Sequence, residues 1–296
     1  MIEKIEFPEG VNWTIGYVTG ADFLGNTAEL PSAASLYRYV SNKVADIKFD
    51  ITGNNCSRMF EGSAIKIAPF FDTSKVTNMS YMFSSTSIST IPQYDTSNVT
   101  NMTYMFNSCG SLKTIPDLNT PKVTNMSYMF NGCQYLEASP QLDMSNVTNM
   151  AQMFYNCQRL KTIPDLNTVK AANFGTASYS TWLYGCTNLA SIGVIDCDSI
   201  TNIAYALGST SNSNLKHLGG FRNLGKASSV SNTNSSYFLN YAPNLTYESV
   251  MNVLNLLYDR ASAGLSVLTL KLHTKHMAML SDDDKAIATN KGWTLA

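Results

Sequence analysis

The sequence predicts an α/β repeat fold, a solenoid of about eight coils of 23–24 residues, each combining a short strand with a short helix. Three observations predict it. Four eight-residue segments are nearly identical, they recur every 23 or 24 residues, and Asn, Ser and Thr are abundant throughout. A period in this range is typical of leucine-rich repeats, whose units stack because none buries a core alone. We therefore expect a leucine-rich-repeat-like solenoid over residues 50–245, an N-terminal cap at 1–49 and a C-terminal α/β cap at 246–296.

The four clear copies begin with Val-Thr-Asn-Met and end, except for small changes, with Tyr-Met-Phe. Their last residues are Phe83, Phe106, Phe130 and Phe154. Weaker copies continue the register on both sides, with anchors at Phe60, Leu183, Leu207 and Leu239. The repeated unit therefore accounts for most of the chain.

Each unit predicts one helix and one strand. Val, Met, Met and Phe occupy positions 0, 3, 6 and 7 of each copy, the spacing of one helical face. The preceding Asp-Thr-Ser supplies oxygens that suit a helix N-cap. The Leu-x-x-Ile stretch that follows predicts a short strand, which the next Pro ends.

The two flanks predict caps, which a stack of repeats needs to cover its ends. Near the N-terminus we expect a strand around Trp13–Val18 and an apolar segment at Leu36–Val40. Near the C-terminus, Thr246–Tyr258 predicts an amphipathic helix and Ser266–Leu272 a strand. Ser281, followed by three Asp residues, predicts the start of another helix.

The composition excludes several classes of protein. Charged residues make up 14% of the 296 residues, against roughly 25% in an average soluble domain, and the net charge is −1. Such a chain has no basic field for nucleic acid or an anionic membrane. No targeting signal is recognisable, and no apolar run approaches the roughly 18 residues of a membrane span.

Several residue types recur at one phase of the repeat, and each admits a structural and a chemical interpretation. We expect the cysteines and methionines to fill the core, with disulfides or a metal site as the alternative. We expect the Asn and Asp columns to cap turns, because the pattern of calcium-binding β-helices is missing. The members are Cys109, Cys133, Cys157 and Cys186; Asn78, Asn101, Asn125, Asn149, Asn173 and Asn202; and Asp72, Asp95, Asn119, Asp143, Asn167 and Asp196.

Two columns are candidate binding surfaces. The tyrosines at position 5 of the copies lie 140° from the Val on a helical wheel, nearly opposite the apolar stripe, where a row of rings could bind protein or sugar. The alternative is that each tyrosine packs on the ring of its neighbour and simply covers the outer surface. The second column lies on the expected strand face and is polar. The candidate residues are Tyr81, Tyr104, Tyr128 and Tyr205 in the first column and Lys113 and Lys161 in the second.

The sequence does not predict an enzyme. The histidines His217, His273 and His276 have no Cys or carboxylate beside them at metal-ligand spacing. The chain contains no Gly-x-Ser-x-Gly, Walker loop, dinucleotide fingerprint or His-Glu-x-x-His. We therefore expect no catalytic residues, no cofactor and no metal site.

The pattern Asp-Thr-Ser-x-Val-Thr-Asn-Met-x-x-Met-Phe-x-x-Cys-x-x-Leu resembles the BspA-type leucine-rich repeat of bacterial surface proteins. The resemblance covers roughly residues 50–245 and is strongest over 70–167. This chain departs from the commoner form by having Ile-Pro-x-Leu-Asp, which makes its unit shorter. Together with the tail at 280–296, the short repeats also resemble virion proteins of phages that infect gut bacteria. The resemblance implies adhesion and contacts with proteins or host surfaces.

We therefore expect a non-catalytic binding or structural protein, located in a virion or at the cell surface. The interpretation that we favour is a virion-associated or host-attachment protein. The alternatives are a bacterial cell-surface adhesin of BspA type and a glycan-active enzyme, for which the sequence offers no paired carboxylates. The expected partners are a protein or glycan on a cell surface, or other virion proteins, without nucleic acid or membrane insertion. Self-association is compatible with this interpretation.

Overall fold

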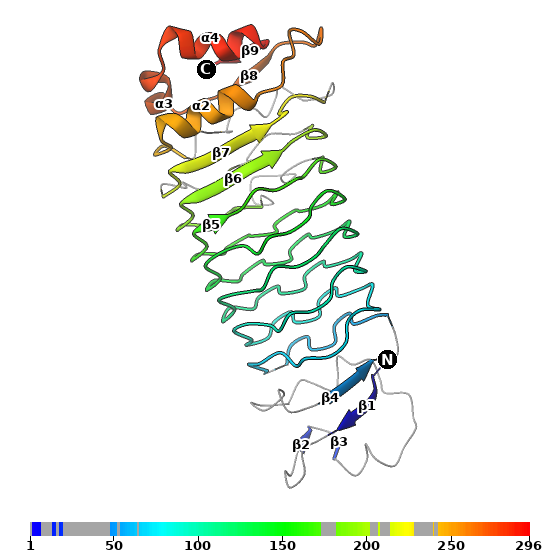
Figure 1. Cartoon of the computed structure of the whole chain (residues 1–296). Coiled ribbons are helices and arrows are strands. Elements are labelled where there is room, and N and C mark those ends of the chain that lie inside the picture. The colour runs from blue at the N-terminus through cyan, green and yellow to red at the C-terminus, as the bar shows by residue number, and fades with distance from the viewer. Residues whose placement is uncertain are drawn as a thin grey trace.

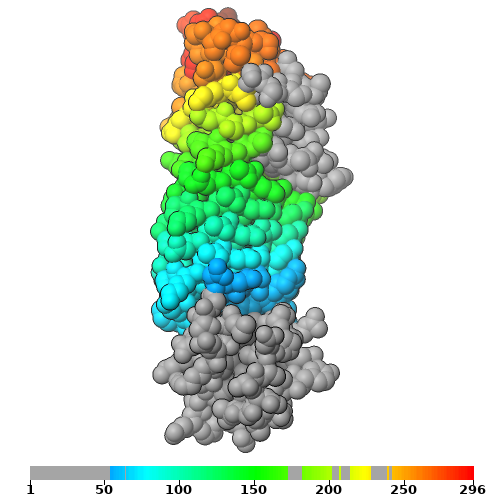
Figure 2. All heavy atoms as spheres, turned by 90° about the vertical axis from the view of Figure 1, so that its right-hand side faces the viewer, coloured from blue at the N-terminus to red at the C-terminus, as the bar shows by residue number. Residues whose placement is uncertain are grey.

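The computed structural model describes residues 2–6, 14–15, 18–19, 48–51, 54–63, 65–172, 182–201, 207, 214–227, 239 and 242–296. In these residues the molecule is elongated, with β1 near one end and the C-terminal helices at the other (Figure 1). Between them, successive passes of the chain lie side by side. Figure 2 shows that these passes form one continuous surface from residue 54 toward the C-terminal region.

The strands form four small sheets. β1 (Ile2–Glu6) pairs antiparallel with β4 (Lys48–Ile51), and β2 (Thr14–Ile15) pairs antiparallel with β3 (Val18–Thr19). A parallel sheet has the order β5-β6-β7, formed by Thr162–Ile163, Ser191–Asp196 and His217–Arg222. After it come α2 (Tyr247–Leu256), β8 (Leu268–Leu270), α3 (Thr274–Met279), α4 (Asp282–Asn290) and β9 (Trp293–Leu295), with β8 parallel to β9.

The predicted leucine-rich-repeat-like solenoid of strand-plus-helix coils is wrong. Every helix among the described residues lies after residue 246. From residue 54 to 161 the described residues of the repeated units form turns joined by isolated parallel bridges. The first strand after them is the two-residue β5. The chain is therefore not a regular leucine-rich-repeat solenoid.

The backbone of the repeated segment explains why no helix forms. Tyr81 and Ser85 have φ angles of 58° and 60°, in the left-handed region that a right-handed helix excludes. Between them, Met82 and Ser84 donate their N–H groups to carbonyls three residues back, whereas Tyr81 and Phe83 donate to the next unit. Two successive turns therefore bury the same apolar positions that a helical face would bury, so the spacing alone does not distinguish them.

The core of the repeated units is a row of phenylalanines. Phe60, Phe83, Phe106, Phe130 and Phe154 are fully buried, and neighbouring ring centroids lie between 5.2 and 5.8 Å apart. The rings are within 11° of parallel, a stacked arrangement of aromatic pairs. The repeated Phe thus fixes the distance between units.

The cysteines are buried and free, as the core interpretation predicted. The thiols of Cys109, Cys133 and Cys157 donate to the carbonyl oxygens of the Phe in the preceding unit, over 2.9 to 3.1 Å. Burial raises the pKa of the Cys109 thiol to about 11. Each thiol therefore acts as a small hydrogen-bond donor that links one unit to the next.

The C-terminal region contains the predicted helices. α2 begins after its N-cap Thr246, and Val250, Val253 and Leu254 are buried on one face. Ser281 and Asp284 form a capping box at the start of α4, as the sequence indicated. The strand predicted at 266–272 is shorter, since β8 covers only Leu268–Leu270. Leu224 bridges to Leu257, which joins this region to the repeated units.

The N-terminal predictions are tested only in part. Where one strand around Trp13–Val18 was expected, the described residues form two short strands, β2 and β3, paired with each other. The apolar segment Leu36–Val40 lies outside the described residues. The limits of the three predicted segments, 1–49, 50–245 and 246–296, stay predictions.

Candidate functional site

Three of the predicted tyrosines form a stack on the surface. The ring centroids of Tyr81 and Tyr104 are 4.5 Å apart, and those of Tyr104 and Tyr128 are 4.3 Å apart, with both pairs 7° from parallel. The guanidinium carbon of Arg58 lies 4.1 Å from the centre of the Tyr81 ring, a cation–π contact at the end of the row. We call Tyr81, Tyr104 and Tyr128 the tyrosine stack.

The rings are half-buried rather than fully exposed, and they lie on turns rather than on the helix that the sequence predicted. All three residues have φ between 58° and 60°, and this backbone directs each ring onto the ring of the adjacent unit. Burial and the neighbouring Tyr128 and Tyr81 raise the pKa of Tyr104 to about 12. The stack therefore offers hydroxyl groups and ring edges, while most ring faces are covered by other rings. Tyr205 lies outside the described residues.

The two candidate lysines belong to another phase of the repeat. Lys113 and Lys161 are exposed on either side of Glu137, and backbone hydrogen bonds connect all three units. The Nζ of Lys161 lies 2.6 Å from Oε2 of Glu137. The hydrogen bond from Lys161, followed by its charge and those of Arg159 and Lys113, lowers the pKa of Glu137. Solvent screens such an exposed pair, so it contributes little to stability, and it leaves Lys113 as the more available cation.

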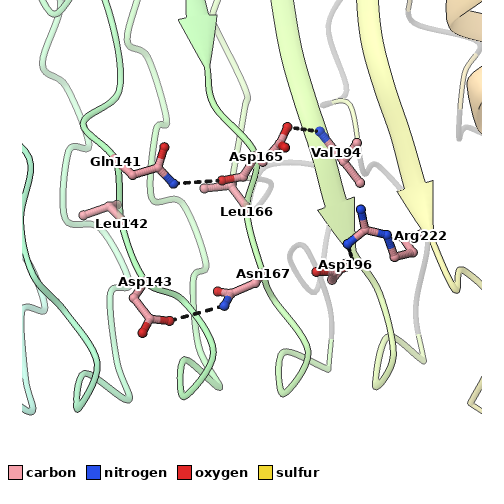
Figure 3. A pocket seen from close by; sticks show the side chains of 9 residues that line it. All are labelled: Gln141, Leu142, Asp143, Asp165, Leu166, Asn167, Val194, Asp196 and Arg222. Atoms are coloured by element: carbon pink, nitrogen blue, oxygen red, sulfur yellow. Dashed lines mark hydrogen bonds and ion pairs between the residues drawn. The ribbon is translucent and has the colours of Figure 1, made fainter.

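A hollow that the sequence did not predict lies on a further face of the repeated units (Figure 3). Its volume is about 370 Å³, within the range of ligand pockets. We call it the polar groove. Its wall residues come from four neighbouring passes of the chain: Gln141, Leu142, Asp143, Asp165, Leu166, Asn167, Val194, Asp196 and Arg222.

Each carboxylate of the polar groove accepts a hydrogen bond, either from a backbone N–H group or from Arg222. Asp165 Oδ1 accepts the N–H of Val194 over 2.7 Å, and Asp143 Oδ1 accepts that of Ser145 over 2.9 Å. Asp196 Oδ1 accepts from Arg222 Nη1 over 2.9 Å. The bond to Ser145 lowers the pKa of Asp143. These hydrogen bonds therefore fix the three side chains in the groove.

The polar side chains of this face, which are exposed or half-buried, alternate from one unit to the next. The first row is Gln93, Asp117, Gln141 and Asp165, the second is Asp95, Asn119, Asp143 and Asn167, and the third is Asn98, Lys122, Asn146 and Lys170. In each row an amide side chain separates the charged side chains. Several of these amides are hydrogen-bonded to the charged neighbour; for example, Lys122 Nζ donates to Asn98 Oδ1 over 2.7 Å. Over these four units the alternation keeps like charges apart, whereas Asp72 and Asp95, one unit earlier in the second row, are like-charged neighbours.

Our sequence reasoning treated only the second of these rows, as capping residues. That role is confirmed for Asp72, Asp95 and Asp143, each of which accepts an N–H two residues on. The Asn column behaves in the same way, with Asn101 Oδ1 accepting the N–H of Thr103. The alternation of Gln and Asp after each Pro was visible in the sequence and would have indicated the groove.

The described part of the chain contains neither a candidate metal site nor a candidate membrane span. No group of three or more His, Cys, Asp or Glu side chains there could hold a metal ion. No helix there has the length and apolar character needed to cross a membrane.

Fold and surface together define a repeat protein with an elongated, largely polar exterior. Residues 54–167 match a family model described as "Mycoplasma protein of unknown function, DUF285". The matched segment contains the four clear copies and covers less than half of the chain. No curated protein matches the chain significantly, and no solved structure does.

Proposed function

We propose that this chain is a non-catalytic binding protein of a virion or host-attachment apparatus, and that its tyrosine stack contacts a protein partner. The observation that carries the proposal is the geometry of Tyr81, Tyr104 and Tyr128, whose rings are held 4.5 and 4.3 Å apart. Rings that are fixed before binding lose little conformational freedom on association, which favours affinity.

The exposed parts of the stack indicate which partner fits. Because adjacent rings cover each other's faces, a sugar ring has little free aromatic surface to pack on. Ring edges and hydroxyl groups remain, and such groups combine apolar area with hydrogen bonding in protein interfaces. A protein on a host cell, or another virion protein, is therefore the partner that we propose.

A bacterial cell-surface adhesin is the second candidate. The observation that favours it is the match of residues 54–167 to a family described from Mycoplasma. In that case the same tyrosine stack would serve attachment from the bacterial side.

The test is binding of the fluorescently labelled chain to intact gut bacteria, before and after protease treatment of the cells. Tyr104→Asn and Tyr128→Asn remove the rings while keeping a residue that tolerates positive φ. We expect the double variant to lose binding at least tenfold, and protease treatment to abolish binding of the parent.

Tyr135→Asn is the matched control, because Tyr135 is exposed and contacts Arg159 outside the stack. Undiminished binding by the double variant, provided that it melts within a few degrees of the parent, would refute the role of the stack. Binding that survives protease treatment would refute a protein partner.

A further inference from the structure

We propose that the polar groove and the row of side chains that continues it form a second binding site, for a linear, neutral, β-linked polysaccharide. This site goes beyond the proposed function, because it lies at a different phase of the repeat from the tyrosine stack and recognises a different class of molecule. It rests on three features: free hydrogen-bonding atoms, an exposed aromatic ring and the two-unit alternation.

The first feature is the set of free atoms in the polar groove. Asp143, Asp165 and Asp196 each use Oδ1 in an internal bond. The Oδ2 atoms of these three side chains have no hydrogen bond within the described residues. The amides of Gln141 and Asn167 each donate one N–H, to the Asp165 carbonyl and to Asp143 Oδ1, and their second N–H lies beside these acceptors. The groove therefore presents acceptors and donors together, as a molecule rich in hydroxyl groups requires.

The second feature is a matching hollow about three units toward the N-terminus. It has a volume of about 400 Å³, and its lining includes Phe70, Gln93 and Asp95, at the same phase of the repeat as the polar groove. Phe70 is 70% exposed. An exposed aromatic side chain beside hydrogen-bonding groups suits a sugar ring, whose C–H face is apolar and whose edge is polar.

The third feature is the spacing along the face. At about 4.8 Å between passes, the row from Phe70 to Val194 covers about 24 Å. Because its side chains alternate, equivalent groups such as Gln93 and Gln141 recur only after two passes, or about 9.6 Å. A flat chain whose equivalent groups return with every second sugar, as in β-1,4-linked glycans, presents hydroxyl groups with a comparable period.

Charge selects among such ligands. The groove carries three carboxylates, and only Asp196 is paired with a cation, Arg222. Its field therefore opposes anionic polysaccharides and favours neutral ones. Leu142 and Leu166 form a buried floor between the two polar rows, so the groove stays shallow and open at both ends.

The test is isothermal titration of the full chain with cellohexaose and chitohexaose. Maltohexaose, whose α-linkages curl the chain, and a hyaluronan hexasaccharide, which is acidic, are the comparison probes. We expect one or both β-1,4-linked neutral hexasaccharides to bind at least tenfold more tightly than either comparison probe. Failure of both to bind, or equal binding of the acidic probe, would overturn the proposal.

Variants locate the site on the face. Gln141→Ala and Arg222→Ala alter exposed side chains, and Phe70→Ala removes the exposed ring. We expect each to weaken binding of the β-linked hexasaccharide at least fivefold, whereas Gln158→Ala, exposed at another phase, leaves it unchanged. Parent-like affinity in all three would refute the site. We expect Tyr104→Asn to leave the affinity for the hexasaccharide unchanged. Failure of the polysaccharide site can therefore be distinguished from failure of the tyrosine stack.

Discussion

Arg260 joins the repeated units to the C-terminal region, and its replacement by Met should destabilise the protein by about 3 kcal/mol. The side chain is fully buried. Its Nε donates to the carbonyl of Ser266 over 2.7 Å, and its Nη1 donates to the carbonyl of Gly225. Met retains the apolar stem but leaves both carbonyls without this donor, at about 1–3 kcal/mol each. Burial of the guanidinium charge is itself unfavourable, and it lowers the pKa of Arg260. Met removes this desolvation cost, which offsets part of the loss.

The assay is thermal unfolding combined with hydrogen exchange. At roughly 2–4 °C per kcal/mol, the midpoint should fall by roughly 6–12 °C. Exchange should quicken first in α2, β8 and β9, because repeat proteins can unfold by segments. Arg159→Met is the control, since Arg159 is exposed over Tyr135 and should shift the midpoint by no more than about 2 °C. An unchanged midpoint for Arg260→Met would refute the assignment of the guanidinium as a structural link.

Three further predictions follow from the described groups. His276 is buried, and burial, followed by the nearby His273, lowers its pKa to about 4. Since the folded pKa lies below the unfolded value of about 6.5, stability should fall as the pH drops from about 6.5 toward 4, and urea titrations of His276→Phe should lose this dependence. Cys133 and Cys157 are fully buried and their pKa values are raised by burial, so iodoacetamide at pH 8 should label them only on unfolding, and fast labelling of the native chain would contradict their place in the core. Asn125→Ala removes the acceptor for the Ser127 N–H and hydroxyl, and denaturant unfolding should show a loss of about 1–2 kcal/mol, whereas no loss would mean that the turn is held by the backbone alone.

The sequence predicted which residues are buried better than it predicted the backbone that buries them. Val76, Met79, Met82 and Phe83 are all in the core, as their spacing indicated. The helix expected there is missing, because turns with left-handed residues at Tyr81 and Ser85 give the same apolar spacing. No pattern of hydrophobicity separates the two, and Tyr and Ser carry no strong signal for positive φ, as Gly would. The helices near the C-terminus were predictable because Thr246 and Ser281 provide explicit caps.

The candidate site was predicted in part. The recurrence of Tyr81, Tyr104 and Tyr128 identified a row of rings, and the structure places them in contact. Their half-burial depends on the turn backbone, which the sequence did not reveal. The polar groove needed knowledge of which passes lie side by side, because its Arg222 is far along the chain from Gln141.

The alternation of amides and charged groups has a consequence for how such a chain can grow. Removing or duplicating one unit would place Asp165 beside another Asp, or Lys170 beside another Lys, in the altered register. Removing or duplicating two units, for example residues 91–138, would keep every neighbour relationship. Over residues 91–170 the alternating module is therefore the pair of units, and Asp72 beside Asp95 shows that the fold tolerates a like-charged pair where the alternation stops.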